Sequence, residues 1–337
     1  MTAFYTVFLA MGSFVGPITG GYIAAHHSLA WLHWTNVILA AVAFVTCFFF
    51  QPETLYKRSI TSETETAGTD KPSREEKEVV PTTTALPIPS YAPYTFMRSL
   101  KPFNYHGGIG RKFLAPYLTL RLPGVWLVSF WYAGLVGAIV TISMVGAQIV
   151  SIPPYLWGSD AGLINAGAMV GAALGCIYTY FLSDFTTKRL AKKDLHGFSE
   201  PESRIITAIP SLAISTAGTF IFGFVAQNPS PKGWVGLQVG YAMVAFGLMQ
   251  APSVGFNYII ECYPRIAGDC FVAVTCSRAI IAFAWTFFVG SWTEHRGYAE
   301  PFGIFGMLLG LFAMLTFVFW AWGKRFRIAT TGWVIST

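Results

Sequence analysis

The stretch Gly12–Gly21, GSFVGPITGG, places four glycines and a proline inside an apolar segment long enough to cross a membrane. Gly12, Gly16 and Gly20 recur every four residues, so they form one stripe on a helix and allow another backbone to approach closely. Pro17 removes one backbone hydrogen bond and kinks or loosens the helix. Helix packing alone explains such a stripe, so the rest of the chain must decide whether it means more.

The composition identifies an integral membrane protein. Of the 337 residues, 54% are hydrophobic and only 11% are charged, whereas soluble domains carry about 25% charged residues. The mean hydropathy is +0.52. A hydrocarbon core of about 30 Å requires roughly 20 apolar residues in a helix. Eight stretches meet this length: 2–25, 30–50, 123–149, 158–182, 205–226, 234–260, 270–291 and 302–323.

The basic residues are distributed unevenly between the two sides of these spans. When loops are assigned alternately to the two sides, one side carries only Lys232 and Arg296, and almost all other Lys and Arg residues fall on the opposite side. Positively charged loops stay in the cytoplasm. We therefore expect both chain ends to be cytoplasmic and interpret the net charge of +6 as a topology signal, not as evidence of nucleic-acid binding.

The spans divide unequally around one long polar segment. Residues 59–84 are rich in Ser, Thr, Glu and Pro, so part of this segment should be disordered. We expect two spans, a cytoplasmic central loop, six spans and a cytoplasmic tail, at 1–51, 52–121, 122–325 and 326–337.

Four motifs, in order along the chain, resemble the major facilitator superfamily. The first is Gly-x3-Gly-Pro-x2-Gly-Gly at Gly12–Gly21, which resembles that family's fifth-span antiporter motif, although Ala3 replaces a further glycine of the longer form. The others are QPETLYKR at 51–58, the segment 183–204, and NYIIECYPRIAGD at 257–269. They are similar to loops of the fungal drug:proton antiporter branch, which has twelve spans.

The resemblance implies an all-α integral membrane fold, a helical bundle of about eight transmembrane helices that correspond to family spans five to twelve. It also implies secondary transport: proton-coupled efflux of a small organic substrate by alternating access. The implied partners are this substrate, protons and the lipid bilayer, for a monomer in the plasma membrane. Because no counterpart of the first four family spans is present, the alternative is a truncated fragment or incomplete gene model without transport of its own.

A group of charges after the span at 158–182 is a candidate cytoplasmic gate. Asp184 lies where this span leaves the membrane, and cations follow four and five residues later, so an ion pair here can latch one face closed. Solvated charges that obey the positive-inside rule are the alternative. The resemblance assigns the gate to Asp184, Lys188, Arg189, Glu200, Glu202 and Arg204.

Arg278 is the most informative single charge. It lies near the middle of the span at 270–291, where an arginine requires water or a partner. Glu261 and Asp269, at the ends of neighbouring spans, are the expected pairing candidates. We weigh a conformational or substrate-path role against a purely structural ion pair.

A cavity for a moderately apolar substrate needs aromatic surface and a few polar groups. Gln250, Asn257, Trp131 and Trp285 combine these properties within the spans. Lipid-facing or interfacial anchoring is the alternative for the aromatic residues.

Enzymatic functions lack support in the sequence. It contains no GxxxxGK phosphate loop and no Gly-x-Ser-x-Gly elbow, so neither nucleotide hydrolysis nor serine hydrolysis is expected. The pair His26–His27 has no evident third metal ligand. We therefore predict a protein without catalytic residues, metal or cofactor.

Overall fold

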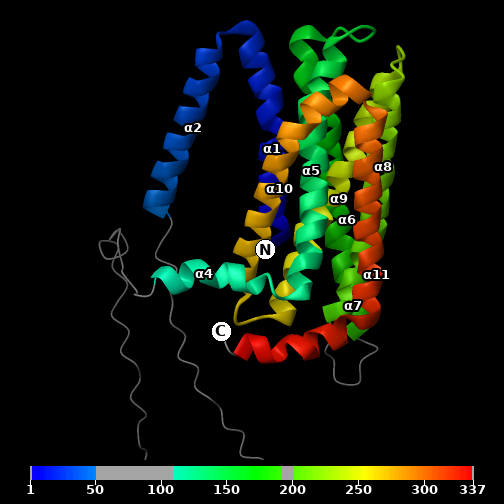
Figure 1. Cartoon of the computed structure of the whole chain (residues 1–337). Coiled ribbons are helices and arrows are strands. Elements are labelled where there is room, and N and C mark those ends of the chain that lie inside the picture. Colours follow the sequence, from blue (N-terminus) through cyan, green and yellow to red (C-terminus); the bar gives the residue numbers. More distant parts are fainter. Residues whose placement is uncertain (1, 51–108, 192–200, 336–337) are drawn as a thin grey trace, which may run out of the picture. The chain divides into compact units, whose positions relative to one another are not determined.

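A computed structural model describes residues 2–50, 109–191 and 201–335, which form helices and no strand (Figure 1). The elements are α1 (Thr2–His26), α2 (Leu29–Phe50), α4 (Ile109–Thr119), α5 (Pro123–Ser151), η1 (Gly158–Leu163), α6 (Ile164–Ala191), α7 (Pro201–Ile205), η2 (Ile206–Ala208), α8 (Ile209–Gln227), α9 (Gly233–Cys262), α10 (Ala267–Arg296) and α11 (Ala299–Ile335).

The described helices confirm the predicted all-α membrane fold. Seven of them, alone or joined to a short 3₁₀ segment, are long and apolar enough to cross a membrane: α2, α5, η1 with α6, η2 with α8, α9, α10 and α11. Helix α1 forms where the first span was expected but is not among these seven. The long polar segment around 52–108, including the QPETLYKR motif, lies outside the described residues.

The chain divides into two compact units, Trp34–Gly107 and the remainder. In the smaller unit the description covers α2 from Trp34 onward, and no residue of α2 is buried. Its large apolar side chains, such as Phe44 and Phe50, are exposed. Such a surface is suited to lipid, since lipid tails solvate apolar side chains without penalty.

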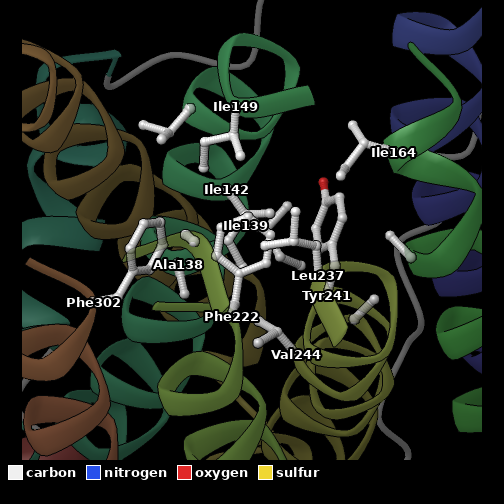
Figure 2. Close-up of a cluster of buried hydrophobic side chains, with 14 of the residues drawn as sticks. Ala138, Ile139, Ile142, Ile149, Ile164, Phe222, Leu237, Tyr241, Val244 and Phe302 are labelled. Carbon is white, nitrogen blue, oxygen red and sulfur yellow. The ribbon is translucent and has the colours of Figure 1, made fainter. Parts of the chain in front are cut away.

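The larger unit is organised around α5, which contributes to two clusters of buried apolar side chains. Figure 2 shows the cluster in the carboxy-terminal half of α5, to which α8 contributes Phe222, α9 contributes Leu237 and α11 contributes Phe302. The second cluster surrounds Trp131 near the start of α5. Because α5 packs against α9, α10 and α11, it sets the relative positions of the candidate site residues.

Gly167, Gly171 and Gly175 recur every four residues along α6 and bring α6 and α9 into close contact. A Cβ atom at Gly167 would lie 2.6 Å from the Gln238 carbonyl oxygen, and one at Gly171 would overlap the backbone of Ala242. These approaches are shorter than any side chain tolerates, so the helices can pack at this distance only with glycine.

Among the described residues, no backbone lies against the stripe at Gly12, Gly16 and Gly20. An added Cβ at Gly12 or Gly16 would meet no described atom within 4 Å, and at Gly20 it would meet only Leu32. The close approach lies on another face of α1, where a Cβ added at Gly162 of η1 would lie 3.0 Å from the Pro17 carbonyl oxygen. Phe14 supplies the buried anchor of α1, with 1% of its surface exposed.

The last helix is longer than expected. Residues 326–337 are predicted to be a cytoplasmic tail, and α11 continues through this segment to Ile335. Its last turns, red in Figure 1, run crosswise to the spans of this unit, as α4 does at the same end. The side chain of Thr330 is buried there, and its hydroxyl donates to the Phe326 carbonyl oxygen at 2.9 Å.

At the opposite end, a sharp turn separates α10 from α11. Gly297 has φ +75°, a conformation that favours glycine. The side-chain oxygen of Gln227, at the end of α8, accepts hydrogen bonds from the backbone N–H groups of Tyr298 (2.8 Å) and Ala299 (3.1 Å). Gln227 therefore satisfies donors at the start of α11 that have no partner within the helix.

Candidate functional site

Two ion pairs connect α7 to the ends of two long helices. The Arg204 guanidinium contacts the Glu261 carboxylate on α9 at 2.9 Å, and Arg327 Nε on α11 contacts Glu202 Oε1 at 3.3 Å. Only 6% of the Glu202 side chain is exposed, compared with 30% for Glu261. The short helix α7 thus presents the Glu202 carboxylate to α11 and the Arg204 guanidinium to α9.

The backbone of α11 is shaped to cover this acid. An added Cβ at Gly323 would lie 3.0 Å from Glu202 Cγ, so glycine allows α11 to pass directly over the carboxylate. Beside it, burial raises the pKa of Tyr263 to about 12, opposed by a hydrogen bond with Thr330. The phenol is therefore neutral at physiological pH, and the two ion pairs supply the charge of this cluster.

The structure brings together part of the predicted gate. Glu202 and Arg204 meet Glu261 and Arg327, whereas the side chains of Asp184, Lys188 and Arg189 and the whole of Glu200 lie outside the described residues. Both pairs join elements of the six-span part, so they brace α7, α9 and α11 against one another. Arg327 was missed because nothing in its sequence surroundings distinguishes it from the neighbouring basic residues.

Arg278 does not pair with either acid expected for it. Glu261 is engaged by Arg204, and no ion pair joins Arg278 to any carboxylate in the part of the chain that the structure describes. Asp269 lies nine residues earlier on the same helix, about 14 Å along its axis at 1.5 Å per residue. That separation exceeds the reach of an ion pair.

Instead, the Arg278 guanidinium lies over an aromatic ring. Its Cζ is 4.9 Å from the ring centroid of Tyr132 on α5. The Nε atom is buried and has no hydrogen-bond partner among the described residues. A cation–π contact contributes about 0.5–2 kcal/mol, less than the roughly 2.5–3.5 kcal/mol that arginine costs at the centre of a membrane helix. The contact with the Tyr132 ring therefore offsets only part of the free-energy cost of placing the Arg278 charge in the membrane.

Two of the proposed cavity residues take part in helix packing. Trp131 is fully buried, and its indole N–H donates to the Thr316 hydroxyl at 3.1 Å. The Gln250 amide donates to the Gly175 carbonyl oxygen at 2.9 Å and to the Thr179 hydroxyl at 2.6 Å. In this conformation neither side chain presents a surface to a substrate.

The other two, Asn257 and Trp285, are partly exposed. Trp285 lies against Phe305 of α11, with ring centroids 4.0 Å apart, and faces Gly137 of α5. It is on the same face of α10 as Arg278, seven residues away, or about two helical turns. Arg278 and Trp285 therefore lie on one face of α10 and both contact α5, whereas Trp131 bonds to α11 and Gln250 bonds to α6.

A buried polar network that the sequence did not reveal joins three helices. The Tyr241 hydroxyl on α9 donates to Asn165 Oδ1 of α6 at 3.1 Å, so it accepts from the Ser143 hydroxyl of α5, 2.6 Å away. Figure 2 shows this hydroxyl pointing towards Ile164. The ring of Phe14 meets Tyr241 edge-on, with centroids 6.0 Å apart. Helix α1 therefore contacts the six-span part directly at this network.

Comparison with known proteins agrees with this architecture. The sequence model of the Major Facilitator Superfamily matches residues 1–267. The chain is 26% identical to an uncharacterized MFS-type transporter of Schizosaccharomyces pombe, over 96% of this chain and 62% of that protein.

Two further relatives are similar at comparable identity. Protein HOL1 of Saccharomyces cerevisiae is 23% identical over 99% of this chain and 66% of its own length. A probable efflux pump, mfs2, of Aspergillus flavus is 24% identical over 96% of this chain and 72% of its own length. The chain therefore spans about two thirds of the length of these relatives.

Proposed function

Because the chain belongs to the Major Facilitator Superfamily of membrane transport proteins, we propose that it moves small organic compounds outward across the membrane in exchange for protons. The observation that carries this proposal is the family match over residues 1–267, which includes α1 and most of the six-span part. The name of one relative, a probable efflux pump, supports the outward direction. The antiporter-like pattern at Gly12–Gly21 supports proton coupling.

In the proposed mechanism, α1 and the six-span part change their relative orientation during alternating access. The Glu202–Arg327 and Arg204–Glu261 pairs hold α7, α9 and α11 together, so these helices move as one body. The contact that must adjust is the one between Phe14 and Tyr241, where packed rings rest beside a polar network. Of the predicted gate residues, Glu202 and Arg204 then act within one moving part and keep it rigid.

We further propose that the protein acts as a monomer in the plasma membrane with both ends in the cytoplasm. The scarcity of basic residues in the loops of Lys232 and Arg296 supports this orientation.

A proton-flux assay tests the function. The purified chain is reconstituted into vesicles that contain a pH-sensitive dye, and three compounds of different charge are added in turn: naphthalene-2-sulfonate, naphthalene-2-sulfonamide and rhodamine 6G. We expect at least one compound to drive proton movement that protein-free vesicles lack and that a protonophore abolishes. If none of the three does so, the proposal fails and the alternative, a chain that does not transport by itself, is favoured.

A further inference from the structure

Arg278 carries a positive charge at mid-depth of a membrane helix, and the described residues provide no carboxylate to balance it. It lies eleven residues into α10, about 17 Å along the helix axis, which is roughly half of a 30 Å hydrocarbon core. We propose that Arg278, seated against Tyr132, binds the anionic group of the transported compound, so that organic acids are the preferred substrates. This inference rests on the proposed transport function.

The chemistry of the guanidinium favours an oxyanion over other ligands. Its planar fork of N–H donors matches a carboxylate or sulfonate with two parallel hydrogen bonds. The buried Nε of Arg278 has no acceptor in the described part of the chain, so an entering oxyanion would give it one. A neutral or cationic compound offers no comparable interaction at this position.

The nearest described acids are engaged elsewhere or lie too far away. Glu261 contacts Arg204, and Glu202 contacts Arg327, both at the α7 end of the bundle. Asp269 is about two and a half turns away along α10. The charge of Arg278 is thus available for an external anion.

The surroundings of Arg278 also suit the apolar part of an organic acid. Trp285 follows on the same face of α10 and is only partly buried. The ring of Tyr132, which lies against the guanidinium, meets the ring of Phe256 edge-on, with centroids 5.9 Å apart. A compound with one anionic group and an aromatic body therefore finds a cation and, about two turns along the same face, the partly exposed ring of Trp285.

Binding of matched probes to the purified full chain tests the proposal. Naphthalene-2-sulfonate and naphthalene-2-sulfonamide share one ring system and differ by a negative charge. We expect wild-type protein to prefer the sulfonate, and Arg278→Gln to weaken sulfonate binding by about tenfold, the loss typical of one charge-assisted hydrogen bond. Sulfonamide binding should not change. Arg296→Gln, which removes a cation at the end of the same helix, is the matched control and should bind like wild type.

A measurement on wild-type protein covers the case in which Arg278→Gln does not fold. Phenylglyoxal modifies accessible arginines, and the sulfonate should protect the Arg278 peptide but not the Arg296 peptide. Equal binding of the two probes, undetectable binding of both, or no protection of Arg278 would overturn the proposal. In one further outcome, rhodamine 6G drives proton flux in the vesicle assay, while the sulfonate neither binds nor drives flux. That result would support the transport function but contradict the preference for organic acids.

Discussion

At the scale of single residues, the ion pair between Glu202 and Arg327 should contribute most to stability, because the Glu202 side chain is buried. Replacing Glu202 by Gln removes the buried carboxylate that Arg327 contacts, at a site that is mostly closed to water. Removing one member of a buried pair is strongly destabilising. Because 28% of the Arg327 side chain is exposed, we expect a smaller loss, on the order of 2 kcal/mol, measured as a lower thermal unfolding midpoint.

The control for this prediction is the exposed pair Arg296–Glu300, whose atoms are 3.9 Å apart. Glu300→Gln should change stability by less than about 1 kcal/mol, because solvent screens exposed pairs. Equal effects of the two substitutions would show that Glu202 is not a buried brace between α7 and α11.

Tyr241 offers a second test at this scale. Tyr241→Phe keeps the ring against Phe14 but removes the hydroxyl that joins Ser143 and Asn165. Buried polar groups left without partners cost about 1–3 kcal/mol, so the unfolding midpoint should fall although no apolar contact is lost. Ser143→Ala removes only one partner of the hydroxyl and should cost less. A larger effect of Ser143→Ala would contradict this account of the network.

At the scale of helices, the α6–α9 contact depends on the absence of a side chain at Gly171. Gly171→Leu places atoms where the backbone of Ala242 lies, so the two helices must separate. We expect a sharp fall in the monodisperse fraction on size-exclusion chromatography of a fluorescent fusion. Gly303→Leu, at a helical position with no atom within 4 Å of an added Cβ, is the matched control and should retain it.

The glycines of α1 allow folding and function to be separated. Gly12→Ala and Gly16→Ala add a methyl group where no described atom lies within 4 Å. Both variants should therefore fold like wild type, with unchanged thermal midpoints. If proton flux falls in these folded variants, the glycines serve the transport cycle; destabilised protein would instead indicate a packing role.

The difference between these two glycine stripes shows what local sequence can predict. A long apolar run predicts a span because its length must match the membrane, and all eight expected stretches are helical. The repeat of small residues at Gly167–Gly175 and that at Gly12–Gly20 look alike, yet within the described part of the chain only the first has a backbone against it. Which face meets a neighbour depends on the packing of distant helices, which a local pattern does not contain.

The same limit applies to the charges. The sequence identified Arg278, Glu261, Glu202 and Arg204 as important but assigned Glu261 to the wrong arginine. The pairing is decided by α7, a five-residue helix that brings Arg204 to the end of α9. Tyr132 lies 146 positions from its partner Arg278, and Arg327 lies 125 positions from its partner Glu202. No spacing rule connects residues so far apart in the chain.

At the scale of the whole molecule, the proposed cycle requires α1 to move relative to η1. Gly21 and Gly162 lie opposite each other, since a Cβ at Gly21 would be 3.6 Å from Gly162 Cα. In a background without the five native cysteines, Gly21→Cys with Gly162→Cys should form a disulfide on oxidation. We expect oxidation to stop proton flux and a reductant to restore it. Each single cysteine variant serves as control, and undiminished flux in the cross-linked protein would exclude this movement.

The continuation of α11 to Ile335 bears on how the protein can be labelled. Arg327 lies in the part of α11 beyond the expected span and contacts Glu202. A fluorescent reporter fused in place of this segment would remove Arg327 and leave Glu202 without this ion pair. The fluorescence would then report on a destabilised protein. A reporter placed after Thr337 with a flexible spacer leaves the Glu202–Arg327 ion pair intact. Fluorescence in cells would then follow the amount of native protein.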